Sequence, residues 1–493
     1  MMRAGGNAID AIIATAAVLT VVEPCSNGLG SDLFALIWSP QDKALHGLNS
    51  SGRSPQAWTP DTFKGMDSVP MRGWMSVSVP GAIAGWVALS KRYGKLPFAD
   101  LLAPAIDIAE RGYMVTPIIA SQWARAVPIL QNQPGYAEHF MPHGRAPLPG
   151  ELFRNPAQAE SLRLIAESEG ESFYRGQLAA RIVAHAKAHG GLMTGIDLAA
   201  HVADWVEPIR MGYRGYEVAE IPPNGQGIAA LMALGMLEDF DLKALGPNHP
   251  DYWHLSIEAM KLAFRDVHAQ VADPEYMNVS ASAMLDRDFL KSRAKLIDLK
   301  RAQDFSPSAE LRGGTVYLNA ADESGLMVSL IQSNYYGFGS GVVVDGISLQ
   351  NRAYGFTLDP AHPNCVAGGK RPFHTIIPGF ILKDGQPVGP FGVMGGHMQP
   401  QGHMQTAIRM IDFGENPQAA LDGPRFRVEQ GLEVDLEPWA PAEVRAELAA
   451  RGHKLKENKD SYMDFGSGQI IWKTADGYIT GSDPRRDGCA VGF

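Results

Sequence analysis

The 493-residue sequence has few cysteines and no cluster of basic residues. Its three cysteines, Cys25, Cys365 and Cys489, form no CxxC pair, which argues against a disulfide-stabilised scaffold and fits a reducing compartment. Acidic residues outnumber basic ones by 53 to 43, and the formal net charge is −10. Because nucleic acids are bound by clustered positive charge, no nucleic acid is expected as a partner.

Long apolar runs are scarce as well. The stretch Ala8–Val22 is apolar, but Asp10 interrupts it, and it is shorter than the ~20 residues that a membrane-spanning helix needs. No small-residue cleavage site follows it, as a signal peptide would require. We therefore expect a buried helix at this position, no membrane partner and a cytoplasmic protein.

The common catalytic signatures are absent from the sequence: it has no GxSxG elbow, no phosphate-binding loop, no HExxH and no EF-hand loop. The glycine-rich segment 337–341 lacks dinucleotide-binding spacing and is predicted to be a tight turn. Two His–Met pairs, at 397–398 and 403–404, have no carboxylate or cysteine beside them in the sequence, which favours packing over a soft-metal site. Neither a metal nor a cofactor is predicted.

The hydrophobic periodicity changes along the chain. Helical spacing predicts helices over 96–113, 158–188 and 252–271. From residue 315 onward the pattern alternates, and the runs 315–321 and 326–333, joined by a short Gly-containing loop, predict a β-hairpin. Helices followed by a series of strands indicate an α+β architecture. Further strands are expected at 341–344, 375–382, 388–393, 469–472 and 478–482.

A series of short motifs, spread over essentially the whole chain, resembles the gamma-glutamyltransferase (glutathione hydrolase) family of N-terminal nucleophile hydrolases. The resemblance implies a four-layer αββα sandwich and a proenzyme that cuts itself before a threonine. The motifs, in family order, are GGNAIDA at 5–11, VEP at 22–24, VPG at 79–81, PPNGQG at 222–227, GT at 314–315, KRP at 370–372, GG at 395–396, ALDGPRF at 420–426 and SDPR at 482–485.

By this resemblance the cleaved bond is Gly314–Thr315. Cleavage would give a large subunit, 1–314, and a small catalytic subunit, 315–493, interleaved as one folded unit. The new α-amine of Thr315, with a reference pKa of about 7.7–8.0, can accept the proton of its own hydroxyl, so the nucleophile needs no separate histidine base. Gly314 is flexible enough to let the hydroxyl approach the preceding carbonyl.

Three further residues carry over from the family by position. Ser333, on the second hairpin strand, is expected to hydrogen-bond the nucleophile; the alternative is a solvent-facing strand end. Gly395 and Gly396 match paired glycines whose backbone N–H groups stabilise the oxyanion; the alternative is a simple tight turn.

The substrate-binding positions depart from the family. Its arginine for the substrate α-carboxylate is replaced by Ser51, with Arg53 two residues later, and its acidic residue for the α-ammonium is replaced by Gly355, with Arg352 added. A gained cation favours a carboxylate-bearing acyl group. The expected substrate-binding residues are Arg53, Tyr335, Arg352, His374 and Thr375, the last two standing where the family has paired serines.

Two segments are shorter than in the family. The loop 357–369 is shorter than the usual lid over the active site, which places the chain in a divergent, lidless branch and favours hydrolysis over transpeptidation. The residues Met1–Arg3 already correspond to the interior of a family helix, so we expect that the true N-terminus is missing.

Three functional hypotheses follow. The first is a γ-glutamyl hydrolase or transferase acting on glutathione or related small amides. The second keeps the nucleophile but takes an acidic acyl group without an α-amine, such as a glutaryl or oxamate-like amide. The third is an unprocessed, catalytically silent protein. The resemblance also implies an oligomer of processed large and small subunits.

Overall fold

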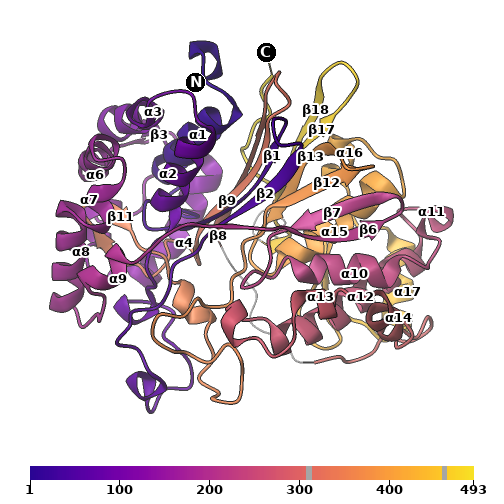
Figure 1. The fold of residues 1–493 in the computed structure, drawn as a ribbon. Helices are drawn as coiled ribbons and strands as arrows, with labels where there is room; N and C mark the ends of the chain where they lie inside the picture. Colours follow the sequence, from indigo (N-terminus) through magenta and orange to yellow (C-terminus); the bar gives the residue numbers. More distant parts are fainter. Residues whose placement is uncertain (307–313, 458–463, 493) are drawn as a thin grey trace. The chain divides into compact units, whose positions relative to one another are not determined.

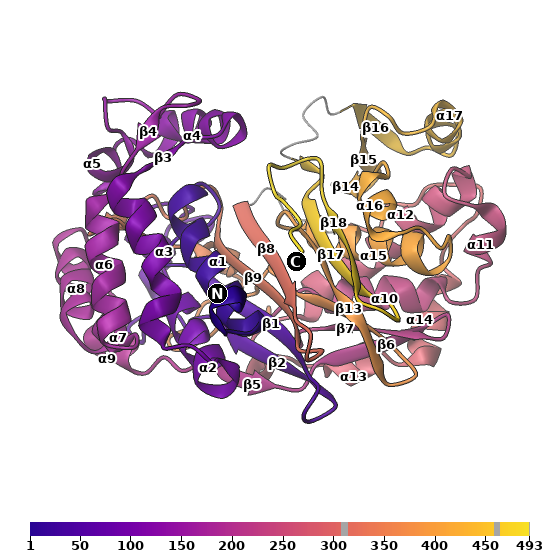
Figure 2. The same ribbon diagram turned by 90° about the horizontal axis from the view of Figure 1, so that it is seen from above.

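The computed structural model describes residues 1–306, 314–457 and 464–492 (Figures 1 and 2). The chain divides into two compact units. Unit 1 comprises Met1–Ala35, Leu48–Val206 and Gly313–His374, and unit 2 comprises Leu36–Gly47, Glu207–Arg312 and Thr375–Phe493. Within the described residues, no helix combines the length and apolar character needed to cross a membrane.

Helix α1 (Ala8–Val22) is buried, as predicted. It begins at a capping box, in which the Asn7 side chain accepts from the backbone of Asp10 and the Asp10 carboxylate accepts from the backbone of Asn7. Its apolar residues pack against α3 (Phe98–Arg111) and the hairpin β8–β9. The preceding residues Met2–Ala4 form a separate 3₁₀ turn, which ends where Gly5 takes a left-handed φ of 91°.

Figure 1 shows α1, α3 and α6 side by side in unit 1. The helix expected over 158–188 is divided into three, because Gly170 begins α7 with a φ of 85° and Gly176 begins α8. The other helices of this unit are α2 (Ala82–Tyr93), α4 (Pro117–Leu130), α5 (Tyr136–Phe140), α6 (Pro156–Glu167), α7 (Glu171–Tyr174), α8 (Gln177–Ala188) and α9 (Gly195–Ala199).

The first sheet has the strand order β5-β2-β1-β9-β8. Its strands β8 and β9 form the predicted antiparallel hairpin, with a register shift between Gly314 and Val316, and they lie side by side in Figure 2. The strands β1 and β2 were not predicted, since β1 is buried at every position and so lacks alternation. The bounds are β1 (Asp32–Ser39), β2 (Ala44–Ser50), β5 (Asp204–Val206), β8 (Gly314–Ala321) and β9 (Met327–Tyr335).

The second sheet lies in unit 2 and is antiparallel throughout, in the order β18-β17-β13-β12-β7-β6. Helix α10 packs against α12 and α15, and α15 also contacts β13. The strand expected from residue 375 begins only at Gly379. The bounds are β6 (Ile209–Tyr213), β7 (Tyr216–Glu220), β12 (Gly379–Lys383), β13 (Gln386–Met394), β17 (Ser467–Lys473), β18 (Tyr478–Ser482), α10 (Ile228–Leu237), α12 (Pro250–Gln270) and α15 (Met398–Ile411).

Smaller elements complete the two units. Unit 1 also holds the two-stranded pairs β3–β4 and β10–β11, and the strand expected at 341–344 is reduced to the two residues of β10. The bounds of these four strands are β3 (Tyr113–Met114), β4 (Leu152–Phe153), β10 (Val343–Val344) and β11 (Ile347–Ser348). Unit 2 also holds β14 (Phe426–Val428), β15 (Glu433–Leu436), β16 (Lys454–Glu457), α11 (Leu242–Leu245), α13 (Ala281–Met284), α14 (Arg287–Ala294), α16 (Pro417–Asp422) and α17 (Ala442–Ala450).

Candidate active site

Three polar groups meet where β8 begins beside the end of β9. The Ser333 hydroxyl lies 2.7 Å from the Gly314 carbonyl oxygen and 3.1 Å from the Thr315 hydroxyl. Thr315 is 1% exposed and Ser333 is fully buried. The structure therefore brings together the two hydroxyl residues that the sequence predicts, and it places both beside the peptide bond that is expected to break.

The direction of each hydrogen bond in this cluster follows from how many hydrogens and lone pairs each group has. A serine hydroxyl has one hydrogen and two acceptor lone pairs. The Gly314 carbonyl can only accept, and the Tyr335 backbone N–H can only donate, at 2.8 Å, to the Ser333 hydroxyl. Ser333 therefore donates to Gly314 and accepts from Thr315. This directs a chain of hydrogen bonds from the Thr315 hydroxyl to the carbonyl oxygen of the bond that is predicted to break.

The local backbone explains why these groups converge. The register shift of the β8–β9 ladder falls at Thr315, and such a bulge turns a side chain out of the regular alternation. A Cβ atom added to Gly314 would lie 3.0 Å from the Cys25 carbonyl oxygen, so this close approach favours glycine. Tyr335, which pairs with Gly314 at the end of β9, has a φ of 77°, a value that non-glycine residues take infrequently.

Arg352 is buried, and it lies beside this cluster. Its guanidinium carbon lies 4.0 Å from the centre of the Tyr335 ring, the distance of a cation–π contact. Burial lowers the pKa of Arg352 to about 10, and Tyr335 and Asp32 oppose that shift. The side chain is therefore a cation at neutral pH, and it is fully buried.

A buried Asp–His pair adjoins Arg352. The Nε2 of His374 lies 3.1 Å from the Asp32 carboxylate, and neither side chain is exposed. Burial, followed by the charges of Arg352 and Arg371, lowers the pKa of His374 well below its usual value, so its neutral ring donates to Asp32. Burial raises the pKa of Asp32 to about 7, against the opposing charge of Arg352. Sequence reasoning singled out His374 but missed Asp32, which lies 342 residues away.

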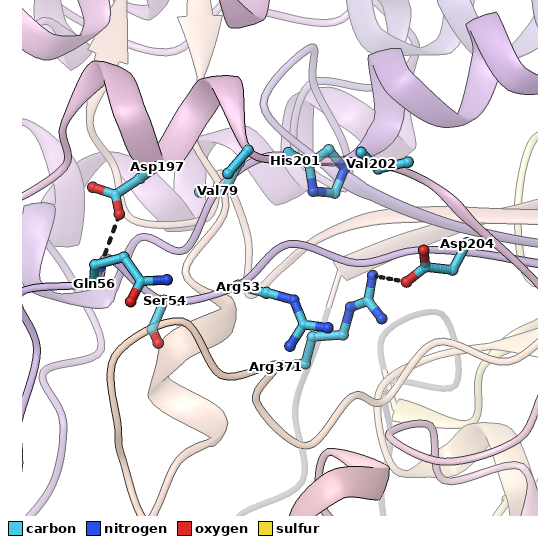
Figure 3. A pocket seen from close by; sticks show the side chains of 10 residues that line it. Arg53, Ser54, Gln56, Val79, Asp197, His201, Val202, Asp204 and Arg371 are labelled. Atoms are coloured by element: carbon cyan, nitrogen blue, oxygen red, sulfur yellow. Dashed lines mark hydrogen bonds and ion pairs between the residues drawn. The ribbon is translucent and has the colours of Figure 1, made fainter.

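Arg53 lies in a pocket of about 250 Å³, together with Arg371. Figure 3 shows the two guanidinium groups next to each other, with Asp204 beside Arg371. Arg371 forms an ion pair with Asp204 at 2.7 Å. Among the described residues, the lining of this pocket does not include Arg352 or Tyr335. The expected substrate-binding residues of unit 1 are thus divided between a buried cluster and this pocket.

The paired glycines lie in unit 2, between β13 and α15. Gly395 and Gly396 have φ values of 132° and 61°, which glycine adopts far more readily than other residues. The Gln226 amide donates to the Gly396 carbonyl at 2.8 Å and to the Thr375 carbonyl at 2.6 Å, so it holds two of the predicted site residues together. The oxyanion role of the glycines stays a prediction.

Two buried polar clusters of unit 2 were not anticipated. His403, from one of the His–Met pairs, lies 2.6 Å from the Glu220 carboxylate, a partner far away in sequence. His254, Glu258 and His453 lie close enough together to resemble a metal-binding group. However, the Lys261 ammonium contacts Glu258 at 2.8 Å and His453 at 3.4 Å. A resident cation thus already compensates the carboxylate, and we assign this cluster a structural role.

The solved structure of a cephalosporin acylase from Bacillus halodurans matches with a TM-score of 0.94 and 49% identity, over 99% of this chain and 92% of that chain. This match confirms the expected class, the αββα fold of N-terminal nucleophile hydrolases.

The sequence comparisons identify the family within that class. The family model of gamma-glutamyltranspeptidase matches residues 1–493. A glutathione hydrolase-like YwrD proenzyme from Bacillus subtilis is 37% identical over 99% of this chain and 94% of its own length. An oxamate amidohydrolase proenzyme from Klebsiella pneumoniae is 36% identical over 100% of this chain and 95% of its own length. The chain belongs to the gamma-glutamyltranspeptidase family, and it is accordingly a hydrolase that cleaves amide bonds.

Proposed function

We propose that the chain cuts itself between Gly314 and Thr315 and then uses Thr315 as the nucleophile of a γ-glutamyl amide hydrolase. The observation that carries this proposal is the hydrogen-bond chain from the Thr315 hydroxyl through Ser333 to the Gly314 carbonyl. It aligns a nucleophile, a proton acceptor and a polarised carbonyl on one peptide bond.

Self-cleavage proceeds as an N-to-O acyl shift that is followed by hydrolysis of the ester. The Thr315 hydroxyl oxygen bonds to the Gly314 carbonyl carbon and passes its proton toward Ser333, and the carbonyl oxygen gains negative charge while Ser333 donates to it. The carbon–nitrogen bond then breaks, and the departing nitrogen takes up a proton and becomes the α-amine of Thr315. Water hydrolyses the remaining ester and leaves Gly314 as a carboxylate. In turnover the same oxygen attacks a substrate amide, with the α-amine as the base.

The substrate class rests on Arg352. A buried guanidinium that stacks on Tyr335 can bind a carboxylate through two parallel hydrogen bonds. A γ-glutamyl group carries such a carboxylate, and glutathione or related γ-glutamyl amides are the proposed substrates. The similarity to a glutathione hydrolase-like proenzyme over 99% of the chain supports this choice.

An acidic acyl group without an α-amine is the second candidate. It is favoured by Gly355, which stands where the family has the acid for the α-ammonium, and by the similarity to an oxamate amidohydrolase proenzyme. The buried Asp32 carboxylate, whose charge acts on Arg352, is already engaged by the Gly52 backbone and His374. A γ-glutamyl anilide and a glutaryl anilide differ only in the ammonium, so the ratio of their kcat/KM values discriminates between the two substrate classes.

Hydrolysis is proposed to exceed transpeptidation, because the loop 357–369 folds back on itself. The backbones of Thr357 and Val366 are hydrogen-bonded, and the Lys370 ammonium binds the carbonyls of Pro363 and Cys365 within the same loop. Because this loop is also shorter than the family's lid over the active site, we propose that water reaches the acyl-enzyme more readily. Product analysis with an added dipeptide acceptor measures the ratio, and a transfer product in excess of free acid would contradict the proposal.

Intact-mass spectrometry under denaturing conditions tests the nucleophile. Two species that meet at Gly314 and Thr315, together accounting for the 53.2 kDa chain plus one water, are expected for the wild type, and one uncut species is expected for Thr315→Ala. The processed form would be a pair of subunits, as the proenzyme names of the relatives suggest. A single mass for the wild type would favour the catalytically silent alternative, and a cut Thr315→Ala chain would exclude Thr315 as the nucleophile.

A further inference from the structure

We propose that Arg72 is a positioning residue for self-cleavage, because it fixes a turn that packs against Gly314. The turn is the glycine-rich segment 337–341, which follows β9. This inference rests on the proposed cut before Thr315 and extends it to a residue from another part of the chain. Arg72 lies in none of the motifs that carry the family resemblance.

The segment 337–341 forms a tight turn, as the sequence predicts. The backbone N–H of Gly339 donates to the Tyr336 carbonyl at 2.6 Å, and that of Gly341 donates to the Phe338 carbonyl at 3.1 Å. Phe338, Gly339 and Gly341 have positive φ values of 55°, 59° and 76°. Because a left-handed backbone is unfavourable for a residue with a side chain, contacts from outside the turn are needed to hold Phe338 in this conformation.

The turn lies beside the bond that is proposed to break. A Cβ atom added to Gly314 would lie 3.7 Å from the Gly337 Cα, which is an ordinary van der Waals distance. The same atom would lie 3.0 Å from the Cys25 carbonyl oxygen, and this oxygen also accepts from the Phe338 backbone N–H at 3.0 Å. Gly314 and the turn therefore share their surroundings, and a shift of Gly337 would move the carbonyl that Thr315 is proposed to attack.

Arg72 binds the turn through two backbone carbonyl groups. Its Nη1 donates to the Gly337 carbonyl at 2.9 Å and also to the Gly339 carbonyl. The backbone N–H of the next residue, Gly73, donates to the Ser340 carbonyl at 2.9 Å. One short segment thus binds both halves of the turn, and the guanidinium is the group that reaches the carbonyl next to Gly314.

The contacts of Arg72 depend on its N–H groups, because no carboxylate balances its charge. Among the residues that the structure describes, Arg72 forms no ion pair, and its Nε is buried without a hydrogen-bond partner there. Burial lowers the pKa of Arg72 from its usual value, but a guanidinium stays protonated at neutral pH. Such a cation is costly to bury, and its bonds to the turn account for its position where an ion pair does not.

The first test measures the rate of self-cleavage, as the fraction of cut chain in intact masses at successive times after refolding. Arg72→Gln removes the guanidinium and should slow cleavage about tenfold or more, because a small misplacement of reacting groups can cost about 100-fold in rate. Arg72→Lys keeps a donor of shorter reach and should recover part of the rate. Thermal midpoints establish that both variants are folded.

Arg214→Gln is the matched control for this test. Arg214 is also partly buried, and its guanidinium donates to the backbone carbonyls of Glu238 and Phe240 in unit 2. It pairs in addition with Asp412 at 3.1 Å, so its loss should destabilise the fold at least as much as the loss of Arg72. We expect Arg214→Gln to lower the thermal midpoint and to leave the rate of cleavage unchanged.

The second test does not require cleavage. Backbone hydrogen exchange is compared by mass spectrometry in Thr315→Ala, which is expected to stay uncut, and in the same protein with Arg72→Gln or Arg214→Gln added. Arg72→Gln should speed exchange in peptides that cover 337–341, because the turn loses the contacts that fix it, and Arg214→Gln should leave these peptides unchanged.

The outcomes separate this inference from the proposed cut. Unchanged exchange in 337–341 after Arg72→Gln would overturn the inference, and so would wild-type cleavage in Arg72→Gln or equal slowing in Arg214→Gln. A wild type that cuts itself before Thr315 at a rate that Arg72→Gln does not alter refutes only this inference. A wild type that stays uncut refutes the proposed cut and the role of Arg72 with it.

Discussion

Replacement of Ser333 by alanine tests the hydrogen-bond chain at the bond that is proposed to break. The substitution removes one hydroxyl that contacts the Gly314 carbonyl at 2.7 Å, the Thr315 hydroxyl at 3.1 Å and the Tyr335 backbone N–H at 2.8 Å. The side chain is fully buried, so solvent cannot easily replace these contacts. Both the rate of self-cleavage and the stability of the fold are expected to fall.

The two losses have different sizes. Removal of one preorganised donor from a developing oxyanion typically slows a reaction about 100- to 1,000-fold, and Ser333 donates to the oxygen that becomes the oxyanion. The Tyr335 N–H is left without the acceptor that it has in the wild type, and a buried donor without a partner costs about 1–3 kcal/mol. The rate effect therefore dominates, and a variant that is still folded should accumulate as uncut chain.

The assay is a time course of intact masses after synthesis or refolding, with the fraction of cut chain as the readout. Ser329→Ala is the matched control, since Ser329 lies on the same strand, is equally buried, and its hydroxyl is hydrogen-bonded to that of Tyr317 at 2.8 Å. Ser333→Thr restores the hydroxyl and should recover part of the rate. Wild-type cleavage in Ser333→Ala, or an equal loss in Ser329→Ala, would refute the assigned role of Ser333.

Three further predictions concern neighbouring groups. Gly314→Ala should slow self-cleavage, because the added Cβ would lie 3.0 Å from the Cys25 carbonyl oxygen; mass spectrometry at early times detects this, and a normal rate would contradict the tight fit. Arg352→Gln should raise KM for an acidic anilide at least tenfold by removing a charge-assisted contact, with little change in the extent of cleavage; an unaltered KM would exclude the carboxylate contact. Burial raises the pKa of Asp32 from 3.8 to about 7, so between these values the folded state holds more of a proton than the unfolded state. Stability therefore falls as the pH rises through this window, by at most about 1.4 kcal/mol per pH unit. Thermal midpoints of Asp32→Asn should show a smaller fall over this range than the wild type, and an equal fall would contradict the shift.

Local pattern was sufficient to predict several elements. The alternation after residue 315 predicts the hairpin of β8 and β9, and the predicted strand 478–482 coincides with β18. Helix α12 was placed within two residues at each end. Strand β9 is buried at every position, so the hairpin was marked by the alternation of residues 315–321 and by the short Gly-containing loop that follows it. The strands β1 and β2 gave no such signal, since β1 is buried on both faces.

By itself the sequence determined the family, the scissile bond Gly314–Thr315 as a hypothesis, and Ser333 as the expected partner of the nucleophile, because these rest on short motifs and on a hairpin of nearby residues. Only the tertiary structure decided which groups surround the substrate positions. It brought Asp32 to His374 and Arg371 beside Arg53, across segments that are distant in the chain. Such pairs leave no local periodicity, and the pKa shift of Asp32 arises from burial, which depends on how the whole chain packs.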